Sequence, residues 1–171
     1  MITTIRNALL PLQGLPLWAA GRAADMLWIQ LGQRVSAPTA RSPDRIVGEY
    51  ALHVMCPWRV SGASGIVAGS SDLFVPADPD LPDEEFQWDR PGAAIVDVHL
   101  GHWINSHAAV PLRVTGVEVD RCSGFVLALE NEFALEVFPD ESARPHGDQE
   151  QWRLLQPGRG TEHFVVCTRG R

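Results

Sequence analysis

Apolar and polar side chains alternate between Gly48 and Ser61. The even positions of this stretch are all apolar: Tyr50, Leu52, Val54, Cys56, Trp58 and Val60. His53, Pro57 and Arg59 stand among the odd positions. A period of two is typical of a strand with one buried face, because a helix would scatter these side chains around its axis. Pro57 cannot donate a ladder hydrogen bond, so the sequence predicts a bulge there or an edge position beyond Cys56.

The segment from Leu15 to Leu31 fits two patterns. A helix ended by Gly32 would carry five apolar residues on one face: Leu17, Ala20, Ala24, Leu27 and Leu31. A pair of strands would instead turn near Arg22 to Asp25. The repeat described next favours the strands. The residues ahead of this segment, Met1 to Leu12, predict either a short helix stopped at Pro11 or a loose arm.

A short pattern occurs twice in the chain. Tyr50-Ala-Leu-His-Val returns as Phe133-Ala-Leu-Glu-Val, and an apolar run precedes each copy. A Trp-Arg pair follows each copy, Trp58-Arg59 in the first and Trp152-Arg153 in the second. The pattern predicts a duplicated unit of three strands with loops of different length, and chance similarity between common residues is the alternative.

The rest of the chain predicts more strands and one helix. Gly65 to Val75 is expected to form a strand pair, and Ala93 to Ala109 has the apolar spacing of a helix. Further strands are expected at 114–119, 125–129, 133–138, 151–155 and 163–168. Glu130 to Glu132 would make a tight connection, since Asn tolerates positive φ, although one helix from Phe125 to Phe138 is the alternative.

These elements predict one domain over residues 1–171, with 1–14 as a possible loose arm. The expected class is α+β: a mainly antiparallel sheet with one helix on a face. A doubly wound α/β fold is disfavoured because only one good helical pattern lies between the strands. The expected core residues are Tyr50, Leu52, Val54, Trp58, Phe133, Leu135, Val137 and Trp152.

Charge and composition exclude some function classes. The chain has 14 basic and 21 acidic residues, a net charge of -7, which opposes binding to a phosphate backbone. No run reaches the roughly 18 uninterrupted apolar residues of a spanning helix, so no membrane insertion is expected. Cys56, Cys122 and Cys167 form no CxxC pair, which fits a protein of the reducing cytoplasm.

Four potential metal ligands lie within eleven residues: Asp97, His99, His102 and His107. On a helix His99 and His102 stand at i and i+3, close enough to share a zinc ion. Asp97 would lie almost opposite them. The alternative is that the histidines are exposed or form local hydrogen bonds.

Other candidate catalytic groups have no fixed geometry. Strand alternation places His53 and Cys56 on opposite faces, where the imidazole cannot activate the thiol. No GxSxG, P-loop or GxGxxG pattern occurs. The sequence therefore lends no support to an enzyme, and a metal-dependent enzyme that uses the Asp97 and histidine cluster is kept as the alternative.

Two aromatic residues interrupt an acidic loop between Pro76 and Arg90. Phe86 and Trp88 are flanked by Glu84, Glu85 and Asp89. These rings either fold back onto the sheet or act as exposed anchors for a basic protein partner. A homodimer interface is a competing use of the same loop. We therefore expect a non-enzymatic protein-binding module without a cofactor.

The stretch Leu52 to Arg59 and the later Trp152-Arg-Leu resemble a group of small bacterial proteins that share a Leu-His-Val-x-Cys-Pro-Trp-Arg stretch and have no assigned activity. More loosely, size, acidic charge and strand layout are similar to those of immunity proteins that neutralise toxins. The second resemblance implies a protein partner.

Overall fold

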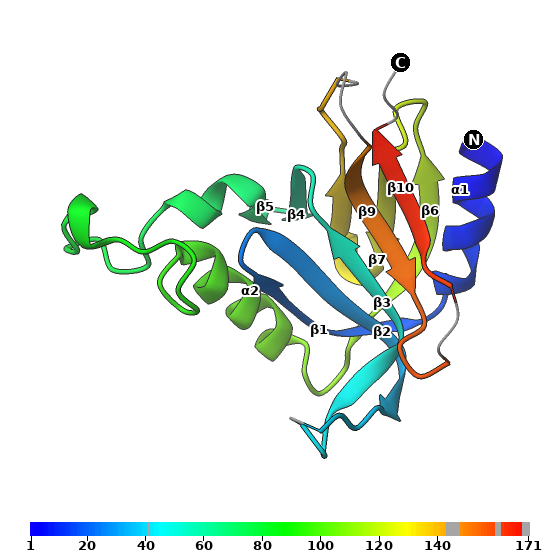
Figure 1. Cartoon of the computed structure of the whole chain (residues 1–171), viewed down its shortest axis with the longest axis horizontal. Coiled ribbons are helices and arrows are strands. Elements are labelled where there is room, and N and C mark those ends of the chain that lie inside the picture. Colours follow the sequence, from blue (N-terminus) through cyan, green and yellow to red (C-terminus); the bar gives the residue numbers. More distant parts are fainter. Residues whose placement is uncertain (41, 143–147, 160–161, 169–171) are drawn as a thin grey trace.

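The computed structural model describes residues 1–171 apart from 41, 143–147, 160–161 and 169–171. Its described part contains ten strands and two α-helices (Figure 1). The helices are α1 (Ile2–Leu9) and α2 (Ile95–Ser106). The strands are β1 (Pro16–Ala23), β2 (Met26–Ser36), β3 (Ile46–Val54), β4 (Trp58–Gly62), β5 (Gly65–Gly69), β6 (Leu112–Val119), β7 (Phe125–Leu129), β8 (Ala134–Val137), β9 (Gln149–Leu155) and β10 (Phe164–Thr168). Short 3-10 turns are η1 (Leu10–Leu12), η2 (Ser70–Phe74), η3 (Asp83–Glu85) and η4 (Glu130–Glu132).

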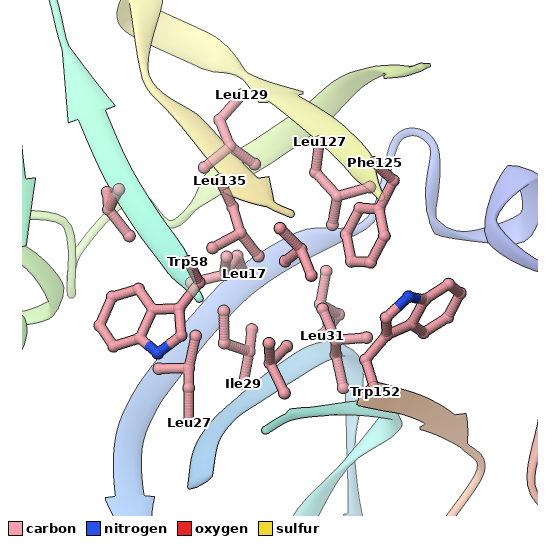
Figure 2. Packing of buried hydrophobic residues seen from close by; sticks show 14 of the residues in the cluster. Leu17, Leu27, Ile29, Leu31, Trp58, Phe125, Leu127, Leu129, Leu135 and Trp152 are labelled. Atoms are coloured by element: carbon pink, nitrogen blue, oxygen red, sulfur yellow. The ribbon is translucent and has the colours of Figure 1, made fainter. Parts of the chain in front are cut away.

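All ten strands belong to one antiparallel sheet that folds back on itself. The strand order is β10-β9-β3-β2-β1-β6-β7-β8-β4-β5. The two halves of this order form two layers, joined where Leu17 of β1 pairs with Leu112 of β6. The ring centroids of Phe125 on β7 and Trp152 on β9 lie 4.8 Å apart, so side chains of the two layers meet in one core (Figure 2).

The predicted α+β class is wrong, because the fold is mainly β. In an α+β domain the apolar face of the sheet is covered by helices. Here most of that face packs against the other half of the same sheet, and the core side chains in Figure 2 come from strands. The helices are short, at 8 and 12 residues. No helix among the described residues is long and apolar enough to cross a membrane.

Alternation predicted the core well. Six of the eight expected core residues are buried, and the rings of Tyr50 and Phe133 are partly buried against the same cluster. Both tryptophans of the Trp-Arg pairs are at most 2% exposed. The indole of Trp152 also donates a hydrogen bond to the Ser123 carbonyl at 2.9 Å.

The stretch Gly48 to Ser61 is not one strand. β3 ends at Val54, and β4 begins at Trp58 in the other layer. The amides of Met55 and Cys56 both donate to the Gln151 carbonyl, at 2.9 and 3.1 Å. Pro57 therefore lies where the chain crosses between layers, and no ladder hydrogen bond from its backbone nitrogen is needed there.

Two segments whose sequence fits either a helix or strands are strands in the structure. Residues 16–36 form the hairpin β1–β2, whose turn places Ala24 at φ 53°. Residues 125–129 and 134–137 are also strands, and Asn131 in the connection has φ 57°, as expected for this residue type. Residues 2–12 are helical, and α2 lies within the predicted helix.

The predicted strand pair at Gly65 to Val75 is half wrong. β5 ends at Gly69, and residues 70–74 form the 3-10 turn η2. The Asp72 carboxylate accepts a hydrogen bond from the Gly69 amide at 2.9 Å. Because this side chain satisfies the backbone locally, the chain turns toward α2 and does not continue as a second strand.

The strand order is two-fold pseudo-symmetric. If each strand of β1–β5 is replaced in this order by its counterpart in β6–β10, and the reverse, the result is the original strand order read backwards. The registers agree: Val54 pairs with Trp152 as Val137 pairs with Trp58. His53 is likewise opposite Arg153, as Glu136 is opposite Arg59. The hairpins β4–β5 and β9–β10 are thus exchanged between the two halves of the chain.

The helices follow the same symmetry, which corrects the predicted three-strand unit. Buried residues have the same spacing in both. They are Ile5 and Leu9 of α1 with Leu12 of η1, and Val96, Leu100 and Trp103 of α2. The two helices contact equivalent strands, α1 on β6 and α2 on β1. The structural unit that occurs twice therefore contains one helix and five strands.

Candidate functional site

A loop projects from the body of the protein between η2 and α2 (Figure 1). We call residues 77–93 the acidic arm. Its base is closed by two backbone hydrogen bonds, from the Ala77 amide to the Ala93 carbonyl and from the Ile95 amide to the Val75 carbonyl, each 2.8 Å. The arm is therefore a tied loop that leaves and re-enters the body at one place.

Most of the net charge of the protein lies on the arm. Its six carboxylates are all exposed: Asp78, Asp80, Asp83, Glu84, Glu85 and Asp89. With Arg90 as its one basic side chain, the arm has a formal charge of −5, out of −7 for the chain. The other residues, 15 acidic and 13 basic, nearly balance. The arm is thus a localised source of negative potential.

A buried arginine holds the base of the arm. The Arg22 side chain is 4% exposed, and its guanidinium forms two hydrogen bonds of 2.8 Å with the Asp97 carboxylate. It also donates to the Arg90 carbonyl at 2.9 Å, while the Gly92 amide donates to Asp97 at 2.9 Å. One ion pair therefore joins the end of β1, the start of α2 and the arm.

The environment of Asp97 favours its charged form. Burial alone would raise its pKa, but the hydrogen bonds and the charge of Arg22, with the Gly92 and Ala94 amides, lower the pKa overall. The pseudo-symmetric positions of Arg22 and Asp97 are Val119 and Arg6, which form no such pair. The Arg22–Asp97 pair is thus specific to the half of the protein that carries the arm.

An aromatic pair joins the arm to η2. The rings of Phe74 and Trp88 are in contact, with centroids 5.7 Å apart. Phe74 is 64% exposed, and its neighbour Val75 is 44% exposed. Phe86 is partly buried against the core cluster, so it fastens the arm to the body. Trp88, predicted as an exposed anchor, is only partly exposed. It pairs with Phe74, which precedes the loop and which sequence reasoning missed.

A groove runs beside the C-terminal half of α2, opposite the β4–β5 hairpin. Its volume is about 460 Å³. Its lining includes Trp103 and Phe133, whose ring centroids are 6.2 Å apart, and all three histidines of α2 and its C-cap: His99, His102 and His107. We call this cavity the α2 groove. It brings together the three histidines that the sequence singled out.

The predicted metal cluster is not assembled in this structure. Asp97 is bound to Arg22, so it is separated from the histidines. Among the described residues, no three His, Cys, Asp or Glu side chains lie close enough together to hold a metal ion.

The thiol and imidazole of Cys56 and His53 do not form a catalytic pair. Burial raises the pKa of the Cys56 thiol to about 12, so the reactive thiolate is disfavoured. Burial and the charge of Arg153 lower the pKa of His53 to about 4. His53 Nδ1 accepts a hydrogen bond from Arg153 Nε at 3.1 Å, which gives this imidazole a structural partner.

No family model matches the chain, and no curated protein or solved structure matches it significantly. The likeness to bacterial proteins with the Leu-His-Val-x-Cys-Pro-Trp-Arg stretch, and to immunity proteins, stays a prediction. The function is therefore inferred from the geometry of the arm and the groove.

Proposed function

We propose that this protein is a non-enzymatic binding module whose acidic arm binds a basic protein partner. The observation that carries the proposal is the concentration of charge, because the arm bears −5 of the −7 net charge while the rest of the chain is nearly neutral. Such a charge distribution attracts a basic surface over a long range and raises the association rate.

The aromatic pair and its neighbour Val75 supply contact area of the kind that binding sites use. Trp88 and Phe74 offer paired rings, and Val75 extends the exposed apolar surface. Aromatic anchors next to charged residues are common among the residues that dominate protein interfaces. Arg22 and the two backbone hydrogen bonds order the base of the arm in advance, so less conformational entropy is lost on binding.

The proposal is tested by affinity capture from an extract of the native host with three forms of the protein. The wild type should retain a basic protein, and Phe74→Ala/Trp88→Ala should lose it. The control Ile46→Ala/Val110→Ala, which removes exposed apolar side chains elsewhere, should retain it. With the purified partner, the association rate should fall as salt rises, because ions screen the arm.

Two results would contradict this function. Equal retention by the wild type and Phe74→Ala/Trp88→Ala would show that the aromatic pair is not the contact. The second result is a dimeric wild type in light scattering and a double variant that is a monomer, with no basic partner captured by either. The arm would then be a homodimer interface.

A further inference from the structure

The histidines of the α2 groove are not required by the packing of the helix. The pseudo-symmetry supplies an internal control, since α1 and its following turn pack their buried residues with the same spacing as α2. At the positions equivalent to His99 and His102, the α1 half has Ala8 and Pro11. A helix in this place in the fold therefore needs no imidazole, and the imidazoles call for another explanation.

Two of the imidazoles have a neighbour at Nδ1, a carbonyl for His107 and a carboxylate for His99. His107 Nδ1 lies 2.8 Å from the Trp103 carbonyl, which only accepts, so Nδ1 carries the proton. His99 Nδ1 lies 3.5 Å from the Asp72 carboxylate, an electrostatic contact, and it has no hydrogen-bond partner among the described residues. Both contacts favour the tautomer whose Nε2 is an acceptor. In their neutral forms these rings therefore offer acceptors to a donor-rich ligand.

The groove also offers aromatic faces. Trp103 is 4% exposed, and its indole N–H has no hydrogen-bond partner among the described residues. The ring of Phe133 lies so close to Gly62 that a Cβ there would be 2.9 Å from it, so the glycine leaves room for the ring. Aromatic faces attract cations.

Apart from the histidines, the described lining of the groove carries no basic side chain, while Asp72 touches His99 from outside it. We infer that the α2 groove binds an arginine or lysine side chain of the basic partner. This inference rests on the proposed function. The arm would attract the partner, and the groove would select it by accepting hydrogen bonds from its cationic group.

The test is side-chain NMR of the full chain at pH 8 with N-acetyl-arginine amide as the probe. We expect saturable shifts of the Trp103 indole and of the His99, His102 and His107 rings, whereas His53 and His163 should not shift. N-acetyl-citrulline amide has the same shape without the charge and should bind about tenfold more weakly. Equal shifts with citrulline, or no saturable shift with arginine, would overturn the inference.

Variants separate this site from the arm. His102→Ala removes an exposed ring and should weaken the probe about tenfold. Ala63→Trp at the exposed hairpin tip should fill the groove and abolish binding. Phe74→Ala/Trp88→Ala should leave probe binding unchanged, so the proposal for the groove and the proposal for the arm are tested separately. Unchanged probe binding in folded His102→Ala protein, shown by circular dichroism, would also overturn the inference.

Discussion

Arg22 and Arg59 show how the surroundings of an arginine decide its role. Both form two hydrogen bonds with a carboxylate, Arg22 with Asp97 and Arg59 with Glu136. The Arg22 side chain is 4% exposed and also binds the backbone of the arm, whereas the Arg59 side chain is 45% exposed. Water screens the second pair, so we expect the two arginines to differ strongly in their contribution to stability.

Arg22→Met should lower the free energy of unfolding by about 2–4 kcal/mol, because it leaves the Asp97 carboxylate without its charged partner. Urea unfolding measures this loss, and limited proteolysis should detect faster cleavage of the arm. Arg59→Met is the matched control and should change stability much less. Equal losses in the two variants would show that burial of the Arg22 pair does not matter.

The loss in Arg22→Met should also depend on pH. Since Arg22 lowers the pKa of Asp97 below its unfolded value, the pair stabilises the protein above about pH 4. This contribution is lost as pH falls through the lowered pKa, because protonation neutralises the carboxylate. The difference between the wild type and Arg22→Met should therefore shrink below about pH 4. A difference that stayed constant would contradict the ion pair.

His53 should make stability increase with pH between about 4 and 6.5. Its pKa is about 4 in the folded protein, whereas an unfolded histidine has a pKa of about 6.5. In this range only the unfolded chain binds the proton. The free energy of unfolding therefore rises with pH by at most about 1.4 kcal/mol per pH unit. The rise is smaller than this limit because solvent screens the half-buried His53. His53→Gln should flatten the curve of unfolding free energy against pH, and an unchanged curve in this variant would contradict the lowered pKa of His53.

At the scale of elements, the exchanged hairpins depend on one large side chain each. Trp58 begins β4 and faces Val137 of β8, while Trp152 of β9 faces Val54 of β3. Each tryptophan therefore packs a hairpin from one half of the chain into the other. The two differ in one respect, since Trp152 Nε1 binds the Ser123 carbonyl and Trp58 Nε1 has no hydrogen-bond partner in the described part of the chain.

Truncation should reveal the packing that the two sites share, and a gentler change should reveal the difference. Trp58→Ala and Trp152→Ala should each cost about 3–5 kcal/mol in unfolding free energy. Trp152→Phe should cost about 1 kcal/mol more than Trp58→Phe, because it also leaves the Ser123 carbonyl without its donor. Denaturant unfolding of the four variants tests this, and an equal cost for the two Phe variants would contradict the role of the hydrogen bond.

At the scale of the whole molecule, the two halves of the chain interlock. Three pairings cross between them: β1 with β6, β3 with β9 and β4 with β8. The covalent link between the halves runs through the exposed arm. The strand pairing therefore does not depend on an intact arm, although the arm connects the halves.

A protease site inserted after Asp80 should allow the chain to be cut without separating the halves. The nicked protein should elute as one particle in native size exclusion, because three strand pairings and one core still join the fragments. The fragments should separate only in denaturant. Uncut protein with the same insertion is the control, and separation under native conditions would contradict the exchanged topology.

Local patterns were enough to predict much of the fold. The alternation of Tyr50 to Val60 set the buried face of two strands, and the Trp-Arg pairs marked both hairpins. Asn131 marked a turn because its own side chain tolerates positive φ. The class was missed because alternation shows that a strand has a buried face, but not whether a helix or another strand covers it.

The sequence by itself determined which side chains are buried, where strands turn and where the acidic charge lies, because these properties depend on neighbouring residues. Only the tertiary structure decided which distant residues contact one another. Arg22 meets Asp97 across 75 positions, Phe74 meets Trp88 only after the loop is closed, and the histidines share a groove only because a distant hairpin faces them. Periodicity along a strand or helix carries no information about its partner, so these contacts follow from how the sheet folds back on itself.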